Sequence, residues 1–391
     1  MLGIIKERER NPAEDVEAKL DKALEGLESV LIGEKKIAVI GSNATRPNIN
    51  QMMLRKIAQT FNRSSVSQER VTFILGQSLF EDYRADNVSM LSKEVEGKMK
   101  LVLHDWYSSD LMHMGRTSFR TDVYFNRNLV DAGVRILITE TRLHPFMGYL
   151  GENIALSVTG IKTLQNTFSL LVSEGIGAGK SDENPMYRDS IEITNLANID
   201  FALNVIADAK GNIIEVFAGK PNETISQSIR LVDEIQKVPV EKKGDIVIVS
   251  AGGEPYDRNL YQALNAVNMI SGILKENGIV ILIAECPEGY GNNCFYDWLV
   301  KFKSISDLRD EIRRRFEPGG HQAYFLTRFL EKYKIILVST MPEYYSTGVF
   351  KLMTTKTAND ALRTAMRRVG KTGRIWAVPN GLFTLPTPHT Q

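Results

Sequence analysis

The segment from His144 to Gly151, His-Pro-Phe-Met-Gly-Tyr-Leu-Gly, holds the residue types best suited to chemistry. An imidazole titrates near neutral pH and can accept or donate a proton. The segment follows an apolar run over residues 134–139 whose β-branched residues predict a buried strand. Ligand sites of α/β proteins lie beyond the carboxyl ends of parallel strands. His144 is therefore a candidate catalytic acid or base, and a structural imidazole is the alternative interpretation.

A polar loop over residues 42–48 follows the first predicted strand and opens a helix. Arg46 in this loop can donate two parallel hydrogen bonds to a carboxylate or phosphate, and a helix start carries partial positive charge. The loop is thus a candidate anion receiver. A capped turn with a surface arginine is the alternative interpretation.

Other motifs are weaker. Residues 175–181 imitate a phosphate-binding loop, but Glu174 stands where glycine is required, so a connector is expected. The loop at residues 251–255 follows a strand and is a candidate cleft wall, although it lacks a dinucleotide fingerprint. His104 is expected to be a core imidazole oriented by Asp105, and His321 to cap a helix.

The chain alternates predicted strands and helices, which indicates an α/β protein with two doubly wound lobes, mostly parallel sheets and an interlobe cleft. Strands are predicted near residues 37–40, 71–75, 100–104, 134–139, 201–206, 213–217, 246–250, 279–283, 335–339 and 374–378. Helices are predicted near residues 13–32, 48–61, 86–96, 122–132, 161–171, 191–196, 259–274, 295–315, 322–333 and 358–369.

The predicted organisation has three parts. Residues 1–238 form an N-terminal α/β domain, with residues 236–244 read as a linker, and residues 239–372 form a C-terminal α/β domain. Residues 373–391 supply a closing strand and a tail expected to pack back on the N-terminal domain.

The composition excludes several classes of protein. Among 391 residues, 48 Lys and Arg balance 47 Asp and Glu, so the basic excess of a nucleic-acid binder is absent. Only Cys286 and Cys294 are present, without zinc spacing, which favours a reducing, cytoplasmic setting. No apolar run approaches the length of a membrane span, and the first ten residues lack a signal peptide's apolar core. We expect a small-molecule ligand and no nucleic-acid or membrane partner; the sequence does not specify the oligomeric state.

Eight short segments, in order along nearly the whole chain, resemble the nickel-pincer lactate racemase family. They are residues 43–47 (NATRP), 104–105 (HD), 144–151 (HPFMGYLG), 183–188 (ENPMYR), 200–205 (DFALNV), 217–219 (FAG), 260–262 (LYQ) and 319–324 (GGHQAY). In that family a nucleotide-derived pyridinium holds nickel and accepts a hydride from the carbon bearing the substrate hydroxyl, while two histidines serve opposite faces of the intermediate.

The resemblance implies site residues by position. Arg46 would hold the substrate carboxylate, helped by its loop neighbours Asn43 and Thr45, and His144 would be one acid or base. Tyr261 and Gln262 would lie beside the substrate. The positions that would border the cofactor are Ser78, Gly148, Gly151 and Asn265.

The chain departs from the family at several of these positions. The second catalytic histidine is replaced by Ser78, whose hydroxyl is too weak a base near neutral pH. The lysine that tethers the cofactor is replaced by Ile154, and the nickel-ligating histidine falls near Leu171. Asn265 stands in place of a further lysine, and Asn43 in place of an acidic residue. No metal-binding residue is therefore predicted, and a nickel-pincer nucleotide, if bound, would be non-covalent.

These observations predict a lactate racemase-like protein that binds a small 2-hydroxy or 2-oxo carboxylate in the interlobe cleft. As an enzyme it would be an isomerase that racemises or epimerises a 2-hydroxy acid, or would oxidise it by hydride transfer. The alternative is a non-catalytic homologue that acts as a ligand sensor or partner-binding protein.

Overall fold

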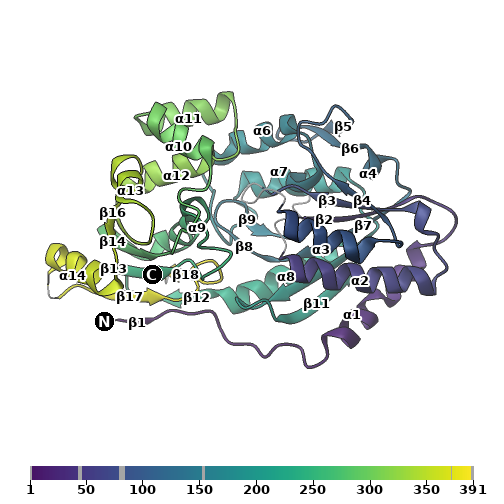
Figure 1. Ribbon diagram of the computed structural model, residues 1–391, viewed down its shortest axis with the longest axis horizontal. Helices are drawn as coiled ribbons and strands as arrows, with labels where there is room; N and C mark the ends of the chain where they lie inside the picture. Colours follow the sequence, from purple (N-terminus) through teal and green to yellow (C-terminus); the bar gives the residue numbers. More distant parts are fainter. Residues whose placement is uncertain (1, 43–45, 79–83, 152–154, 371, 389–391) are drawn as a thin grey trace.

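The computed structural model describes residues 2–42, 46–78, 84–151, 155–370 and 372–388. Two lobes lie side by side, each built around a six-stranded sheet (Figure 1). The N-terminal sheet has the order β11-β10-β7-β2-β3-β4, and all its pairings are parallel except that of β10 with β11. The C-terminal sheet has the order β1-β17-β13-β14-β15-β16 and is parallel throughout. The predicted α/β class is confirmed.

The N-terminal sheet is buried on both faces, as expected for parallel strands with helical crossovers. Val39 faces a core shared with helices α1 to α3, while its neighbours Ala38 and Ile40 face a second core formed with α4, α5 and α7. Its strands are β2 (Ile37–Ser42), β3 (Val71–Gly76), β4 (Lys100–Leu103), β7 (Val134–Glu140), β10 (Phe201–Ala207) and β11 (Ile213–Gly219). Its helices are α1 (Val16–Leu24), α2 (Pro47–Arg63), α3 (Ala85–Val95), α4 (Arg127–Val130), α5 (Ala155–Val158), α6 (Ile161–Ser169), α7 (Pro185–Leu196) and α8 (Pro221–Gln236), with short 3-10 turns at η1 (Glu25–Val30), η2 (Gln68–Arg70) and η3 (Leu170–Val172).

The C-terminal sheet is likewise covered by helices. Ala361 and Ala365 of α14 pack on one face, and α9 and α12 contribute to the large core on the other. The strands are β1 (Gly3–Ile4), β13 (Gly244–Ser250), β14 (Leu274–Ile283), β15 (Lys334–Val338), β16 (Met353–Thr355) and β17 (Ile375–Val378). The helices are α9 (Leu260–Ile270), η4 (Ser271–Ile273), α10 (Asn293–Lys301), α11 (Ile305–Arg314), α12 (Gly320–Leu330), α13 (Glu343–Gly348) and α14 (Ala358–Val369).

Two local predictions are wrong. The helix expected over residues 122–132 is present only as the short α4 (Arg127–Val130), and residues 122–126 instead form strand β6 (Asp122–Asn126), which pairs antiparallel with β5 (Leu111–Arg116). Val123 and Phe125 point into the core while Asp122 and Tyr124 are half-buried, an alternation with the period of a strand. The expected linker over residues 236–244 contains β12 (Lys237–Val240), which pairs in parallel with β18 (Leu385–Pro388).

Both ends of the chain cross between the lobes. Residues 3 and 4, predicted to belong to the N-terminal domain, form strand β1, which pairs with β17 in the C-terminal sheet, and the following segment runs across to α1 (Figure 1). The Arg8 backbone N–H donates to the Ile235 carbonyl (2.8 Å), and the Glu7 carboxylate accepts from Asn380 (2.7 Å). Residues from 375 onward supply β17 to the C-terminal sheet and then β18, which pairs with β12 directly after α8 and also contacts η4 and α9 of the C-terminal lobe.

The lobes meet in a continuous apolar cluster. Phe146, Phe168 and Leu171 of the N-terminal lobe are fully buried in the same core as Ile312 and Phe316 of the C-terminal lobe. Helix α11 lies against α6 and η3 at this junction (Figure 1). In the described part of the chain, no helix is both long and apolar enough to cross a membrane.

Candidate functional site

His144 ends the short strand β8 (Arg142–His144), which forms a hairpin with β9 (Gly148–Leu150). The Met147 backbone N–H donates to Nδ1 of His144 at 2.9 Å. A ring nitrogen that accepts a hydrogen bond carries no proton, so the proton of the neutral imidazole lies on Nε2. His144 is therefore a hydrogen-bond donor through Nε2 in its neutral form.

His321 does not cap a helix, contrary to the prediction. The N-cap of α12 is Gly319, without a side-chain cap, and the His321 ring lies in the first turn of the helix, fully buried. Its Nε2 lies 3.3 Å from the Tyr261 hydroxyl. A Cβ on Gly320 would lie 2.5 Å from the Trp298 ring. In the sequence, the Gly-Gly pair before His321 was the feature that could have indicated this buried position, because a glycine lets the start of α12 pack closely against Trp298.

The two imidazoles share one apolar environment contributed by both lobes. The Phe146 ring centroid lies 4.4 Å from that of His144 and 5.1 Å from that of His321. Burial lowers the pKa of His144 well below its usual value, and the nearby Arg142 and His321 lower it further. Burial also lowers the pKa of His321 to about 3. Both rings are neutral at pH 7.

Helix α9 supplies Tyr261, Gln262 and Asn265, all of which are buried. The Gln322 side-chain amide donates to the Tyr261 carbonyl and to the Asn265 side-chain oxygen, each at 2.9 Å. The Gln262 backbone N–H donates to Asn259, the N-cap of α9 (3.0 Å). The two Gln322 bonds hold α9 against α12 and so fix the Tyr261 phenol beside His321.

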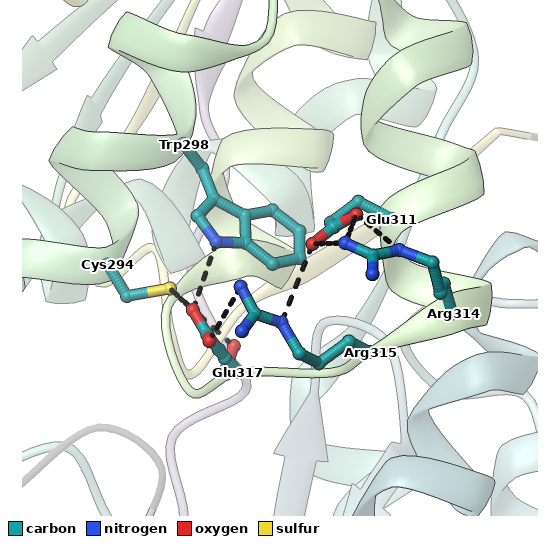
Figure 2. A network of polar contacts seen from close by, with 6 residues as sticks. All are labelled: Cys294, Trp298, Glu311, Arg314, Arg315 and Glu317. Atoms are coloured by element: carbon teal, nitrogen blue, oxygen red, sulfur yellow. Dashed lines mark hydrogen bonds and ion pairs between the residues drawn. The ribbon is translucent and has the colours of Figure 1, made fainter.

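A polar network holds the loop that leads into His321 (Figure 2). The Glu317 carboxylate accepts a hydrogen bond from the Trp298 indole N–H at 3.3 Å and pairs with Arg315 at 3.1 Å. The Cys294 thiol lies 3.5 Å from the same carboxylate. Burial, followed by the charge of Glu317, raises the pKa of that thiol to about 12, so Cys294 is not a nucleophile near neutral pH.

Arg46 immediately precedes α2. Its contacts are separate from those of the His144, Tyr261 and His321 cluster. Its guanidinium pairs with the buried Glu140, with Nε 3.3 Å from the carboxylate, and donates to the Asp208 carbonyl at 2.7 Å. It also lies over the Phe383 ring, 5.4 Å from the centroid. Burial opposes its charge, but Glu140 outweighs burial and raises the pKa of Arg46. The guanidinium therefore stays charged and is already balanced by a carboxylate.

A pocket adjoins the partners of Arg46. Its volume is about 620 Å³, and its lining includes Asp208 of the N-terminal lobe, Gly252 and Phe383 of the C-terminal lobe, and the crossing segment from Lys6 to Arg10. Both lobes thus contribute to a cavity lined by Asp208 and Phe383, two residues that Arg46 contacts. Asn43 and Thr45 lie outside the described residues.

The residues predicted to border the cofactor are packed against, or hydrogen-bonded to, other parts of the N-terminal lobe. Gly148 adopts φ +80°, and a Cβ there would lie 1.9 Å from the Lys180 carbonyl oxygen. The Gly151 carbonyl accepts from the Thr139 hydroxyl at 2.6 Å. Ser78 lies just beyond β3 and is half-buried. A glycine is thus required at position 148, because the backbone at Lys180 approaches it too closely to leave room for a side chain.

The residues present do not fit a tethered, histidine-ligated nickel pincer. Leu171 is fully buried in the interlobe apolar cluster and offers no lone pair to a metal. Across the described ranges, no group of three or more His, Cys, Asp or Glu side chains could hold a metal ion. Ile154, at the tether position, lies outside the described residues.

His104 is a structural imidazole, as predicted, but Asn126 rather than Asp105 orients its Nδ1. Asn126 lies 3.1 Å from Nδ1, and the Thr159 carbonyl lies 2.9 Å from Nε2. Burial lowers the pKa of His104. Its ring links three segments of the N-terminal lobe.

Two family models match the chain. The lactate racemase N-terminal domain matches residues 1–178, and the lactate racemase C-terminal domain matches residues 240–385. The lactate racemase of Thermoanaerobacterium thermosaccharolyticum is 27% identical over 370 residues, which cover 92% of this chain and 86% of that protein. The lactate racemase of Lactiplantibacillus plantarum is 24% identical over 385 residues, covering 94% and 89%.

Solved structures show the same fold. The lactate racemase apoprotein from T. thermosaccharolyticum superposes with a TM-score of 0.87 at 24% identity, covering 98% of this chain and 94% of that chain. A Thermotoga maritima protein superposes with a TM-score of 0.73 at 14% identity, covering 97% and 100%.

Proposed function

Because the chain belongs to the lactate racemase family, we propose that it binds a small 2-hydroxy or 2-oxo carboxylate between its lobes and acts on it as a racemase-like isomerase. The observation that carries this proposal is the cluster of His144, Tyr261 and His321, to which both lobes contribute. A reducing, cytoplasmic setting belongs to the same proposal, in keeping with the two free cysteines.

His144 has a defined part in this proposal. Its Nε2–H is the proton that a ligand oxygen can receive, because Nδ1 accepts from the Met147 backbone. Donation to the carbonyl oxygen of a 2-oxo acid, or to the hydroxyl oxygen of a 2-hydroxy acid, stabilises negative charge that develops there. The aromatic surroundings exclude water, which strengthens that hydrogen bond.

No step in this proposal passes through nickel, because the residues at the ligand position do not fit it. The ring of Phe168 and the side chain of Leu171 fill that region with hydrocarbon. We therefore expect turnover to require a co-substrate that accepts the hydride from the carbon bearing the hydroxyl, with the chain's own donors stabilising charge on the ligand oxygen.

Binding and turnover of L-lactate, D-lactate and pyruvate test the proposal. Titration calorimetry measures binding, and chiral chromatography measures interconversion of the two lactates. We expect binding that His144→Gln weakens at least tenfold, with His113→Gln, a change at an exposed histidine, as the matched control. No binding of any of the three compounds by the parent would refute the proposal.

A non-catalytic ligand sensor is the second candidate, and the Arg46–Glu140 pair with the hydrocarbon at Leu171 favours it. A sensor would bind one of the three compounds without interconverting them. Measurement of lactate interconversion by protein that demonstrably binds lactate separates the two functions. Metal analysis of protein made in cells that also produce the pincer cofactor provides a further test, and we expect substoichiometric nickel.

A further inference from the structure

We propose that residues 9–12 form a movable gate over the cavity between the lobes. The gate belongs to the segment that crosses from β1 to α1 along one side of the molecule (Figure 1). Its outward movement widens the passage from solvent to the region of Asp208 and Phe383, both of which contact Arg46. The inference does not rest on the proposed function, because it concerns access to the cavity and not what binds there.

The gate is a wall shared by two hollows. One is the cavity of about 620 Å³ between the lobes, and the other is a hollow of about 820 Å³ beside α1. The residues that line both are Glu9, Arg10, Pro12 and Ile214, of which the first three belong to the gate. Ile214 lies in β11 and is 8% exposed. Displacement of the gate therefore joins the two hollows into one groove and exposes Ile214.

Both ends of the gate are anchored by hydrogen bonds. Before it, the Glu7 carboxylate accepts from the hydroxyl of Thr384 at 3.0 Å, and Thr384 is fully buried. The backbone N–H of Arg8 is bonded to the N-terminal lobe, as described above. After the gate, the Ala13 backbone N–H donates to the Ile213 carbonyl at 2.9 Å. The gate can therefore move between two fixed ends without detaching the crossing segment from either lobe.

The gate itself is weakly held. Its four residues are exposed, and their backbone groups make no hydrogen bond with any other described residue. Among the described residues, the one polar contact that ties the gate to a lobe is the ion pair of Arg10 with Glu234 of α8, at 2.9 Å. The two side chains are 52% and 58% exposed, so water and salt screen their attraction. A segment held by so few bonds opens at a small cost in free energy.

Movement of the gate is a cheaper way to open the cavity than separation of the lobes. The lobes are joined where α11 packs against α6 and η3, and there the buried rings of Phe168 and Phe316 stack on each other. Separation would expose these rings to water, whereas the gate breaks one exposed ion pair. Pro12 fixes its own φ angle and restricts the backbone of Asn11, so the gate moves as a stiff arch.

Labelling of an Ile214→Cys variant of the full chain with a water-soluble maleimide measures the opening. The natural thiols give a slow background, because burial raises the pKa of Cys286 and of Cys294 to about 12, and protein without the new thiol measures that background. We expect the labelling of Ile214→Cys to accelerate as NaCl is raised from about 0.05 M to about 0.5 M, because salt weakens the ion pair that holds the gate.

Two matched substitutions, each combined with Ile214→Cys, assign the effect. Arg10→Gln removes the pair between the gate and α8, so we expect labelling to become about 1.5- to 5-fold faster, the range that the usual contribution of an exposed pair allows, and to lose its salt dependence. Lys6→Gln removes the exposed pair of Lys6 with Glu9, which joins two residues of the crossing segment and ties it to neither lobe. We expect this control to label at the rate of Ile214→Cys alone.

A second reporter covers the case in which Ile214→Cys folds poorly. Ala209→Cys lies in the turn after β10 and lines the cavity between the lobes, so its labelling should rank the variants in the same order. Labelling that responds neither to salt nor to Arg10→Gln overturns the gate, and so does an equal acceleration by Lys6→Gln. None of these results bears on the binding of lactate or pyruvate, so the proposed function stands or falls separately.

Discussion

The ring of Phe168 in the N-terminal lobe stacks on that of Phe316 in the C-terminal lobe, with 4.1 Å between the ring centroids and 22° between the planes. Leu171 belongs to the same apolar cluster. The junction between the lobes is thus closed by hydrocarbon at the position where the family resemblance implies a metal ligand. The same contact lies beside His321, whose ring is 5.8 Å from Phe168.

Truncation of Phe316 tests the strength of this junction. We expect Phe316→Ala to lower the free energy of unfolding by about 3 to 5 kcal/mol, because it removes a fully buried aromatic ring and leaves a cavity. Urea unfolding followed by circular dichroism measures the change. Phe302→Ala, at a half-buried position, is the control and should cost clearly less; equal losses would argue against a special role for the interlobe stack.

The stability of the protein should fall in mild acid. His104, His144 and His321 have lowered pKa values in the folded protein, chiefly because of burial, so the unfolded chain binds protons more readily. Their contribution is complete above the unfolded value of about 6.5 and is lost as the pH falls below it, for His321 down to about 3. Each group contributes a slope of up to about 1.4 kcal/mol per pH unit.

Thermal melts between pH 4.5 and 7.5 measure that dependence. The melting temperature should be flat near pH 7 and should decline below about pH 6.5. His321→Asn should make the decline shallower, whereas a change at the exposed His113 should leave it as it is. A melting temperature that rises on acidification would contradict the neutral, buried state of these rings.

Glu317 should affect the position of His321, because it holds the loop before α12. We expect Glu317→Gln to destabilise the loop before α12 by about 1 to 3 kcal/mol, because Arg315 loses one of its two ionic partners and the Trp298 hydrogen bond loses its charged acceptor (Figure 2). Tryptophan fluorescence reports the altered indole environment, and a weaker lactate affinity would report displacement of His321. The control is Glu331→Gln, at the exposed C-cap of α12; indistinguishable spectra and affinities in the two variants would remove Glu317 from the argument.

Gly148 should resist substitution for two reasons that a control can separate. Gly148→Ala places a methyl group 1.9 Å from the Lys180 carbonyl oxygen at φ +80°, whereas Gly33→Ala, at φ +83°, meets nothing within 4 Å. We expect about 1 kcal/mol of backbone strain at Gly33 and a loss several times larger at Gly148, where the His144 hairpin must shift. Chemical denaturation of both variants provides the comparison, and similar losses would indicate that strain alone accounts for the requirement.

Most of the helices and strands could be predicted from the sequence. The apolar runs at residues 37–40 and 246–250 predicted strands because buried parallel strands are hydrophobic on both faces, and both are central strands here. Residues 122–126 were misassigned because their alternation is short and a helical segment follows directly. Lys237–Val240 reads as a linker because its partner strand, Leu385–Pro388, lies far away in the sequence.

By itself the sequence determined the α/β class and the resemblance to the lactate racemase family, because these follow from local periodicity and short ordered motifs; the catalytic role of His144 stays a prediction. Only the tertiary structure decided that His321 meets Tyr261, that Met147 fixes the proton of His144 on Nε2, and that Glu140 balances Arg46. The Tyr261 and Glu140 contacts join residues distant in the chain, and all three depend on which atoms face one another after packing. Proton positions and charge balance follow from that geometry. The spacing of residues along the sequence does not predict it.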